Sequence, residues 1–221
     1  MSTLRATFAE RPLAARAFTV LVGGPLVLWA VYEGGWLLIG VLLFISALGF
    51  AEILYLYGHG TMPGFERPLG YGLGFTAAVL YIPVLLGHLL LIRAGPDGMA
   101  HALLTVALVW ATDLVAFFAG RYLGRHKLAP RLSPGKTVEG ALAGVVAGVV
   151  VAMLGHLGLL FGVVVSIAAI VGDLFESWLK RRARVKDSGT ILPGHGGVLD
   201  RFDSLILAAP VAYWLLRLRL R

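Results

Sequence analysis

The 221-residue chain contains no cysteine, and only 14% of its residues are charged. The absence of cysteine excludes disulfides and thiolate metal sites, and it fits a chain handled in a reducing compartment. Soluble globular domains are about one quarter charged, so the low charge excludes that class. Long polar linkers are also missing, which predicts a single domain over residues 1–221.

Hydrophobic residues make up 58% of the chain, and they come in long blocks rather than amphipathic stripes. Such blocks are typical of helices that face lipid, where about 20 apolar residues cross the hydrocarbon layer. The first block follows three arginines but offers no small-residue cleavage site, so we expect an uncleaved span. We predict an all-α, polytopic integral membrane bundle of about seven transmembrane helices, at residues 17–32, 36–57, 72–93, 99–119, 138–154, 157–179 and 203–219.

The basic residues indicate an orientation. Four segments hold most of the lysines and arginines: residues 1–16, 58–71, 120–137 and 180–202. Three joints hold none: residues 33–35, 94–98 and 155–156. With seven spans the four basic segments share one side, which the positive-inside rule makes the cytoplasm. The arginines of residues 217–221 disagree, because this count places them outside. We assign the net charge of +7 to such loops and not to a nucleic-acid partner.

Two carboxylates lie within predicted spans. Asp113, far from either end of its span, would cost about 2.5–3.5 kcal/mol there, so we expect it to face the bundle interior, a partner or an ion. A protonated Asp113 bonded to a neighbouring helix is the alternative. Asp173 opens a helix face shared with Glu176, Ser177 and Lys180. We expect this face to be functional. The alternative is structural, since a Glu176–Lys180 pair would stabilise any helix by a few tenths of a kcal/mol.

The stretch "SPGKTVEG" follows the fourth span. We expect Ser133 and Pro134 to open a turn, Thr137 to cap the next helix and Lys136 to stand beside its positive end. This arrangement suits an anion, although an ordinary capped loop on a basic membrane face would look the same.

The stretch "KDSGTILPGHGGVLDRFDS" precedes the last span. Asp200 and Asp203 are three residues apart at a helix start, so their carboxylates point the same way. With Asp187 nearby they suit Mg²⁺, which takes one or two carboxylates and completes its shell with water and substrate phosphates. Helix capping could explain Asp200, and a salt bridge could explain Asp203.

Residues 177–203 resemble the signature of the phosphatidate cytidylyltransferase (CDP-diacylglycerol synthase) family. Every fixed position of that pattern is filled, by Ser177, Lys180, Arg181, Lys186, Asp187, Pro193, His195, Gly196, Gly197, Asp200, Arg201 and Asp203. An upstream stretch resembles the family's second motif, through Asp113, Gly120, Gly124, Ser133, Pro134, Lys136, Thr137, Glu139 and Gly140. The resemblance covers about residues 110–205, which would hold the active-site motifs in two polar cytoplasmic loops.

The resemblance implies transfer of CMP from CTP to phosphatidic acid, with Mg²⁺ as cofactor. The metal ligands it suggests are Asp187, Asp200 and Asp203, with Asp173 and Asp113 as deeper candidates. The groups expected to neutralise phosphates are Lys136, Lys180, Arg181, Lys186 and Arg201. His195 would bond a phosphate or ribose, or else be structural. Nucleotide-binding positions would be Ser133, Thr137, Gly196 and Gly197.

The expected partners are CTP, phosphatidic acid and membrane lipids, at the cytoplasmic face of a bacterial inner membrane. Oligomeric state is left open, and a homodimer is one arrangement that the sequence permits. A related lipid nucleotidyltransferase or lipid kinase is the alternative activity. An ion or phosphate transporter is disfavoured, because the polar groups cluster on one side and no inverted repeat is visible.

Overall fold

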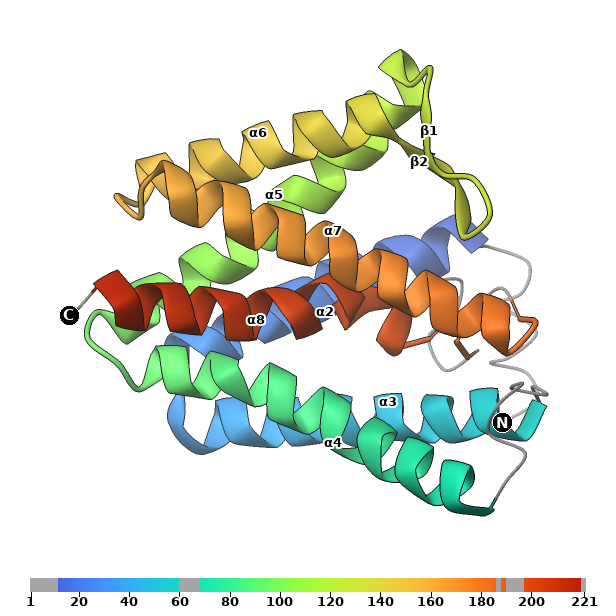
Figure 1. The fold of residues 1–221 in the computed structure, drawn as a ribbon. Coiled ribbons are helices and arrows are strands. Elements are labelled where there is room, and N and C mark those ends of the chain that lie inside the picture. Colours follow the sequence, from blue (N-terminus) through green and yellow to red (C-terminus); the bar gives the residue numbers. More distant parts are fainter. Residues whose placement is uncertain (1–11, 60–67, 186–187, 190–196, 220–221) are drawn as a thin grey trace. The chain divides into compact units, whose positions relative to one another are not determined.

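The computed structural model describes residues 12–59, 68–185, 188–189 and 197–219. These residues form seven helices and a two-stranded sheet (Figure 1). The helices are α2 (Pro12–Glu33), α3 (Gly35–His59), α4 (Pro68–Arg93), α5 (Gly98–Leu123), α6 (Val138–Leu154), α7 (Leu159–Arg182) and α8 (Leu199–Arg219). The strands are β1 (Lys127–Ala129) and β2 (Ser133–Thr137). Each predicted span lies on one of these helices, which confirms the mostly helical architecture.

Among the described helices, three are long and apolar enough to cross a membrane: Gly35–Leu54 within α3, Gly98–Leu123 and Leu159–Arg182. Shorter apolar segments lie in α2, α4 and α6. Helix α8 is more polar, since it carries two aspartates near its start and arginines near its end. The prediction of a helical membrane protein is confirmed to this extent, and seven crossings stay a prediction.

The chain divides into two compact units. The first contains Met1–Pro83 and Lys180–Arg201, and the second contains Val84–Leu179 and Phe202–Arg221. Each unit consists of two separate stretches of the chain. The boundaries fall within α4, α7 and α8, so each of these helices contributes residues to both units. The single domain expected over residues 1–221 stays a prediction.

In the first unit, α2 packs on α3 across a tight joint. Gly34 and Gly35 form this joint with φ of 70° and 51°, a left-handed conformation that glycine adopts without strain. The joint matches the break expected at residues 33–35.

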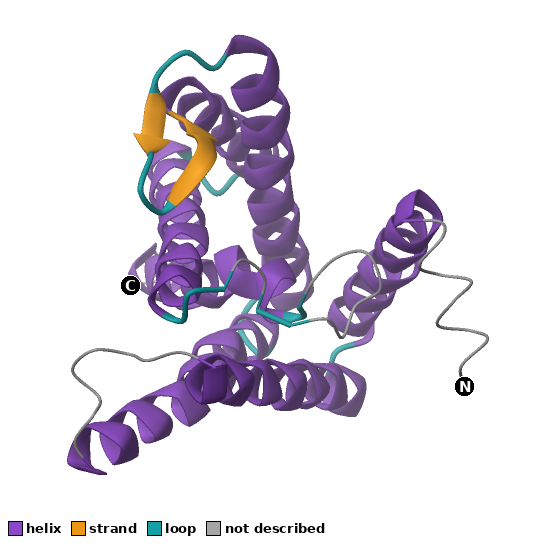
Figure 2. Cartoon of the chain, turned by 90° about the vertical axis from the view of Figure 1, so that its right-hand side faces the viewer, coloured by secondary structure: helices purple, strands orange, loops and turns teal. Residues whose placement is uncertain are grey.

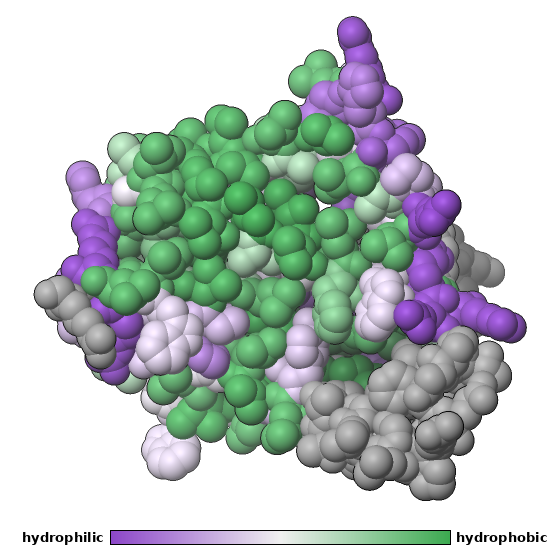
Figure 3. Space-filling view, viewed as in Figure 1, coloured by the Kyte–Doolittle hydropathy of each residue, from purple (hydrophilic) through white to green (hydrophobic). Residues whose placement is uncertain are grey.

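In the second unit, α5 and α6 run side by side (Figure 1) because α6 has a face of small residues. Gly140, Gly144 and Gly148 recur every four residues and are buried, so the two backbones approach closely. A Cβ at Gly144 would lie 2.7 Å from the carbonyl oxygen of Thr112 on α5. Leu142 and Val146 are exposed. Figure 3 shows a mostly hydrophobic surface over α6 and α7, with hydrophilic residues near the strands. This outward face suits lipid.

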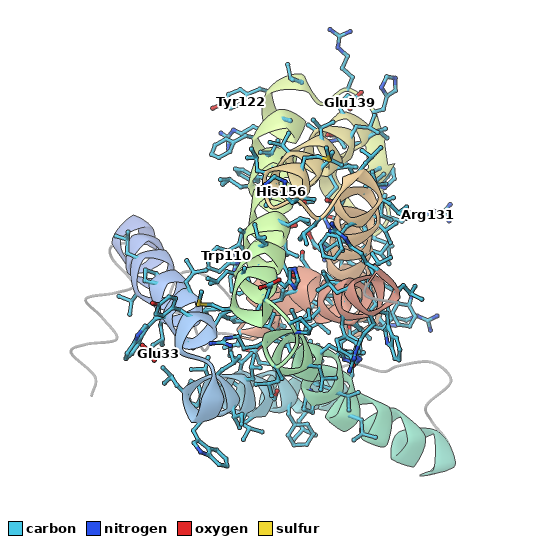
Figure 4. The ribbon with its side chains drawn as sticks, turned by 90° about the vertical axis from the view of Figure 1, so that its left-hand side faces the viewer. Glu33, Trp110, Tyr122, Arg131, Glu139 and His156 are labelled. Atoms are coloured by element: carbon cyan, nitrogen blue, oxygen red, sulfur yellow. The ribbon has the colours of Figure 1, made fainter. Side chains whose placement is uncertain are left out.

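The strands form an antiparallel hairpin between α5 and α6 (Figure 2). Its turn precedes Ser133, so the expectation that Ser133 and Pro134 open a turn is wrong: both lie in β2. Glu139 on α6 stabilises the hairpin by accepting the backbone N–H groups of Arg125, at 3.0 Å, and His126, at 3.2 Å. Figure 4 shows Glu139 at the start of α6 and Arg131 extending away from the helices.

The expectation for Thr137 is confirmed. Its side-chain oxygen accepts the backbone N–H of Gly140 at 3.1 Å, which caps α6. The hairpin itself was not predicted, because its strands are only three and five residues long.

The last turns of α8 lie beside the α4–α5 joint, also within the second unit. A cavity of about 250 Å³ is lined there by Leu91, Pro96 and His101 on one side and by Tyr213, Leu216 and Arg217 on the other. Helix α8 therefore ends at the same end of this unit as the 94–98 joint. The side of a membrane that this end faces stays a prediction.

Candidate active site

Three carboxyl groups of the second unit converge where α7 and α8 meet; we call Asp173, Glu176 and Asp203 the acidic cluster. One oxygen from each lies within 4.8 Å of the others. Asp173 and Glu176 are almost one turn apart on α7, so they share a face. Glu176 is only 2% exposed and Asp203 only 9%. Such burial of carboxylates requires compensation by hydrogen bonds or cations.

A glycine brings the two helices together at this point. A Cβ on Gly172 of α7 would lie 2.5 Å from the backbone oxygen of Asp203 on α8, so only glycine allows this approach. Because Asp173 directly follows Gly172, the close contact also sets Asp173 beside Asp203.

Helix α5 and the hairpin add two charged groups. Asp113 of α5 accepts a hydrogen bond from the Ser204 hydroxyl at 3.1 Å, and Ser204 donates its backbone N–H to Asp203 at 2.7 Å. Lys136 of β2 forms an ion pair with Asp173. Asp113 also interacts electrostatically with Asp173, Asp203 and Lys136. The hairpin therefore carries its lysine to the acidic cluster.

The charges of these groups favour a cation. Asp113 and the acidic cluster provide four carboxyl groups, against which Lys136 places one positive charge. All of the atoms in these four carboxyl groups that could bind a metal are oxygens, the ligand type that Mg²⁺ prefers. Of the predicted metal ligands, the structure brings Asp113, Asp173 and Asp203 together. It adds Glu176, which was predicted to share a helix face with Asp173 but was not proposed as a metal ligand.

Asp200 has other partners, within the first unit. Its Oδ1 lies 2.5 Å from the Lys180 amine, and its Oδ2 accepts backbone N–H groups from Gly197, at 2.8 Å, and Ser188, at 3.1 Å. These contacts cap the start of α8 and hold the preceding segment. They favour a structural role for Asp200, although metal binding by Asp200 and phosphate binding by Lys180 stay predictions.

The remaining predicted site residues are not part of the acidic cluster. Four of them lie outside the described residues: Lys186, Asp187, His195 and Gly196. Arg181 and Arg201 are exposed near the end of α7 and the start of α8. Ser133 is half-buried in β2. Thr137 is buried, and its side-chain oxygen caps α6. Nucleotide binding by Ser133, Thr137 and Gly197 stays a prediction.

One buried carboxylate of the first unit was not predicted from the sequence. Glu52 of α3 is 2% exposed and accepts hydrogen bonds from Ser188, Val198 and Leu199. A lone carboxylate inside the span predicted at 36–57 was the available signal, of the same kind that singled out Asp113.

Comparison with known proteins agrees with the motifs. The model of the cytidylyltransferase family matches residues 62–219. A Brucella abortus protein named phosphatidate cytidylyltransferase is 34% identical over 251 aligned positions, covering 91% of this chain and 92% of its own. Proteins of the same name from Bacillus subtilis and Synechocystis are 42% and 43% identical over 65% and 54% of this chain. The chain spans 57% and 44% of their lengths. The resemblance seen in the motifs is thus confirmed, and the chain belongs to the cytidylyltransferase family.

Proposed function

We propose that this protein transfers CMP from CTP to phosphatidic acid at a membrane surface, producing CDP-diacylglycerol and pyrophosphate. The observation that carries the proposal is the acidic cluster with Lys136 beside it, in a chain of the cytidylyltransferase family. Relatives that carry the name phosphatidate cytidylyltransferase support the choice of substrates.

The reaction needs no protein nucleophile. A phosphate oxygen of the lipid attacks the α-phosphorus of CTP, a P–O bond forms there, and the bond to the β-phosphate breaks to release pyrophosphate. The protein then contributes positioning and charge neutralisation. Lys136 can exchange Asp173 for a phosphate oxygen, because its side chain is partly exposed. Arg181 and Arg201, which the family motif implies as phosphate-binding groups, are exposed in the first unit.

The carboxyl groups suit Mg²⁺. Asp173, Glu176 and Asp203 would hold it, with Asp113 bonded behind them through Ser204. A bound Mg²⁺ supplies neutralisation of the triphosphate and polarisation of the attacked phosphoryl group. The burial of Glu176 and Asp203 keeps water from these oxygens, which strengthens their attraction for a cation.

We further propose that the site faces the cytoplasm in a bacterial inner membrane. Two facts support a common side for the basic loops. In the second unit, Lys136 of the 120–137 segment reaches Asp173 on the half of α7 that leads to Lys180. In the first unit, Glu52 near the end of α3 reaches residues of the 180–202 segment. Both contacts agree with the parity that the positive-inside rule requires.

Purified protein supplied with labelled CTP is expected to place label in an organic-extractable lipid only when phosphatidic acid and Mg²⁺ are both present. Labelled ATP tests the kinase alternative in the same assay, and diacylglycerol in place of phosphatidic acid tests the acceptor. Absence of lipid label under all conditions, together with ion flux in proteoliposomes, would refute the enzyme assignment.

Single cysteines test the orientation, and the chain has no native cysteine to interfere. We expect Arg131→Cys and Arg182→Cys to react with an impermeant maleimide from the cytoplasmic side, and Pro96→Cys to react only from the opposite side. All three positions are exposed. Labelling of the residue-131 and residue-182 cysteines from opposite sides would show that the two basic loops cannot form one site.

A further inference from the structure

The buried Glu52 belongs to none of the motifs that carry the family resemblance. It lies in α3, inside the apolar stretch Gly35–Leu54. A charged carboxylate within such a stretch costs several kcal/mol unless protein groups replace its water. The contacts around Glu52 therefore indicate what this residue is for.

Three hydrogen-bond donors to Glu52 come from one distant region of the chain. The Ser188 hydroxyl donates to Oε2 at 3.1 Å, the Val198 N–H to Oε1 at 2.7 Å and the Leu199 N–H to Oε2 at 2.8 Å. Helix α8 begins at Leu199, and the first N–H groups of a helix have no partner within it. Glu52 thus caps α8 from another helix, with its negative charge at the favourable end of the helix dipole.

Asp200 reinforces the same anchor from within α8. It accepts the N–H groups of Ser188 and Gly197, and it pairs with Lys180. Ser188 therefore contacts both carboxylates, through its hydroxyl and its N–H. The two carboxylates together fix the end of α7, Ser188 and the start of α8 within the first unit.

The glycines of this region fit around the Glu52 carboxylate. A Cβ on Gly197 would lie 2.5 Å from Glu52 Oε2 and 2.0 Å from the Ser188 hydroxyl oxygen. A Cβ on Gly189 would lie 2.9 Å from Glu52 Oε1. No left-handed backbone is involved at either glycine, so close approach of the carboxylate accounts for both. The second glycine of the "HGG" motif thus has a packing reason.

We propose that Glu52 is a positioning residue for the transfer reaction. By capping α8, Glu52 fixes where this helix begins. The helix carries Arg201 in its first turn and Asp203 directly after that turn. This inference rests on the proposed function, since it assigns Glu52 a role in that reaction. The first part of the chain would then contribute directly to the motif region, although it holds no motif itself.

Glu52→Gln tests the proposal, because the amide keeps the size but replaces one acceptor oxygen with a donor that faces an N–H group. In protein that remains folded, we expect kcat to fall at least about tenfold and the KM for CTP to change less than about threefold. Glu52→Asp, which keeps the charge, should recover part of kcat. Glu33→Gln is the matched control, since Glu33 is an exposed carboxylate of the same unit and should retain parental kinetics.

Hydrogen exchange gives a readout that does not depend on activity. The amides of Val198 and Leu199 should exchange faster in Glu52→Gln than in the parent, and at the parental rate in Glu33→Gln. Unchanged exchange would overturn the cap, and a parental kcat despite faster exchange would overturn the positioning role. If Glu52→Gln does not fold, Ser188→Ala removes one hydrogen bond and should give a smaller fall in kcat with the same unchanged KM; a parental kcat there would also overturn the proposal. A parent without transferase activity would refute the proposed function, while the exchange experiment would still decide the cap.

Discussion

Asp203→Asn is expected to lower Mg²⁺ affinity and turnover together, by at least about tenfold. Asn keeps the shape and one carbonyl oxygen but removes one negative charge from the acidic cluster. A charge-assisted contact is worth about 1.5–3 kcal/mol, and 1.4 kcal/mol corresponds to a factor of ten. The measurements are the rate against Mg²⁺ concentration and the Mg²⁺-induced rise in thermal midpoint. The second reports binding without turnover.

The stability of the variant in the absence of Mg²⁺ separates this role from a structural one. Asp203 is buried beside other carboxylates. If its charge serves to bind metal, neutralising it should leave the metal-free thermal midpoint unchanged or higher. Asp97→Asn is the control, because Asp97 is exposed at the α4–α5 joint with φ of 49°, which Asn tolerates. A Mg²⁺ response equal to that of the parent in Asp203→Asn would contradict the assignment.

The helices were predictable because lipid imposes a simple pattern on the chain. Apolar blocks of about 20 residues mark the helices directly, and the structure places a helix at each. The Thr137 cap was also predictable, since a cap bonds only to the next few residues. The hairpin was not, because its strands are only three and five residues long and have no apolar alternation.

The site was predictable where a residue broke the pattern of its surroundings, and less so where partners are distant. Asp113 and Asp173 stood out as carboxylates in apolar helices, and both lie at the acidic cluster. Glu176 was expected on the same functional face but was not proposed as a metal ligand, because a local pairing with Lys180 offered a structural explanation. Glu52 was missed although it also interrupts an apolar stretch. Its partners are 136 to 147 residues away, so no local spacing reveals its role.

Asp200 shows the same limit of local sequence spacing. The i, i+3 spacing of Asp200 and Asp203 correctly puts both at the start of α8, and it suggests a shared ligand. In the structure Asp200 bonds Lys180, Ser188 and Gly197, and metal binding by Asp200 stays a prediction. Spacing along one helix gives the direction of a side chain but does not give the partners that other segments bring to it.

Lys136 connects the hairpin to the acidic cluster. It comes from the hairpin, it is paired with Asp173, and it is partly exposed. Its positive charge lies where a metal ion would also be attracted, so on the proposed function Lys136 and Mg²⁺ would compete for Asp173 unless the lysine turns to a phosphate. The binding of MgCTP would bring both the cation and the phosphate that allow this exchange. The lysine would therefore affect metal binding and nucleotide binding in opposite directions.

Lys136→Met is expected to strengthen Mg²⁺ binding in the absence of CTP while it reduces turnover at least about tenfold and raises the KM for CTP. The methionine keeps an unbranched apolar side chain but removes the competing charge, and the triphosphate loses one charge-assisted contact. Mg²⁺ binding is measured as the concentration that gives half of the maximal thermal shift, and turnover is measured with labelled CTP. Lys127→Met, at an exposed position of β1 in the same hairpin, should leave both quantities at parental values. Asp203→Asn and Lys136→Met should thus both reduce turnover while moving Mg²⁺ affinity in opposite directions. Weaker Mg²⁺ binding in Lys136→Met would mean that the lysine organises the acidic cluster for the metal and does not compete with it.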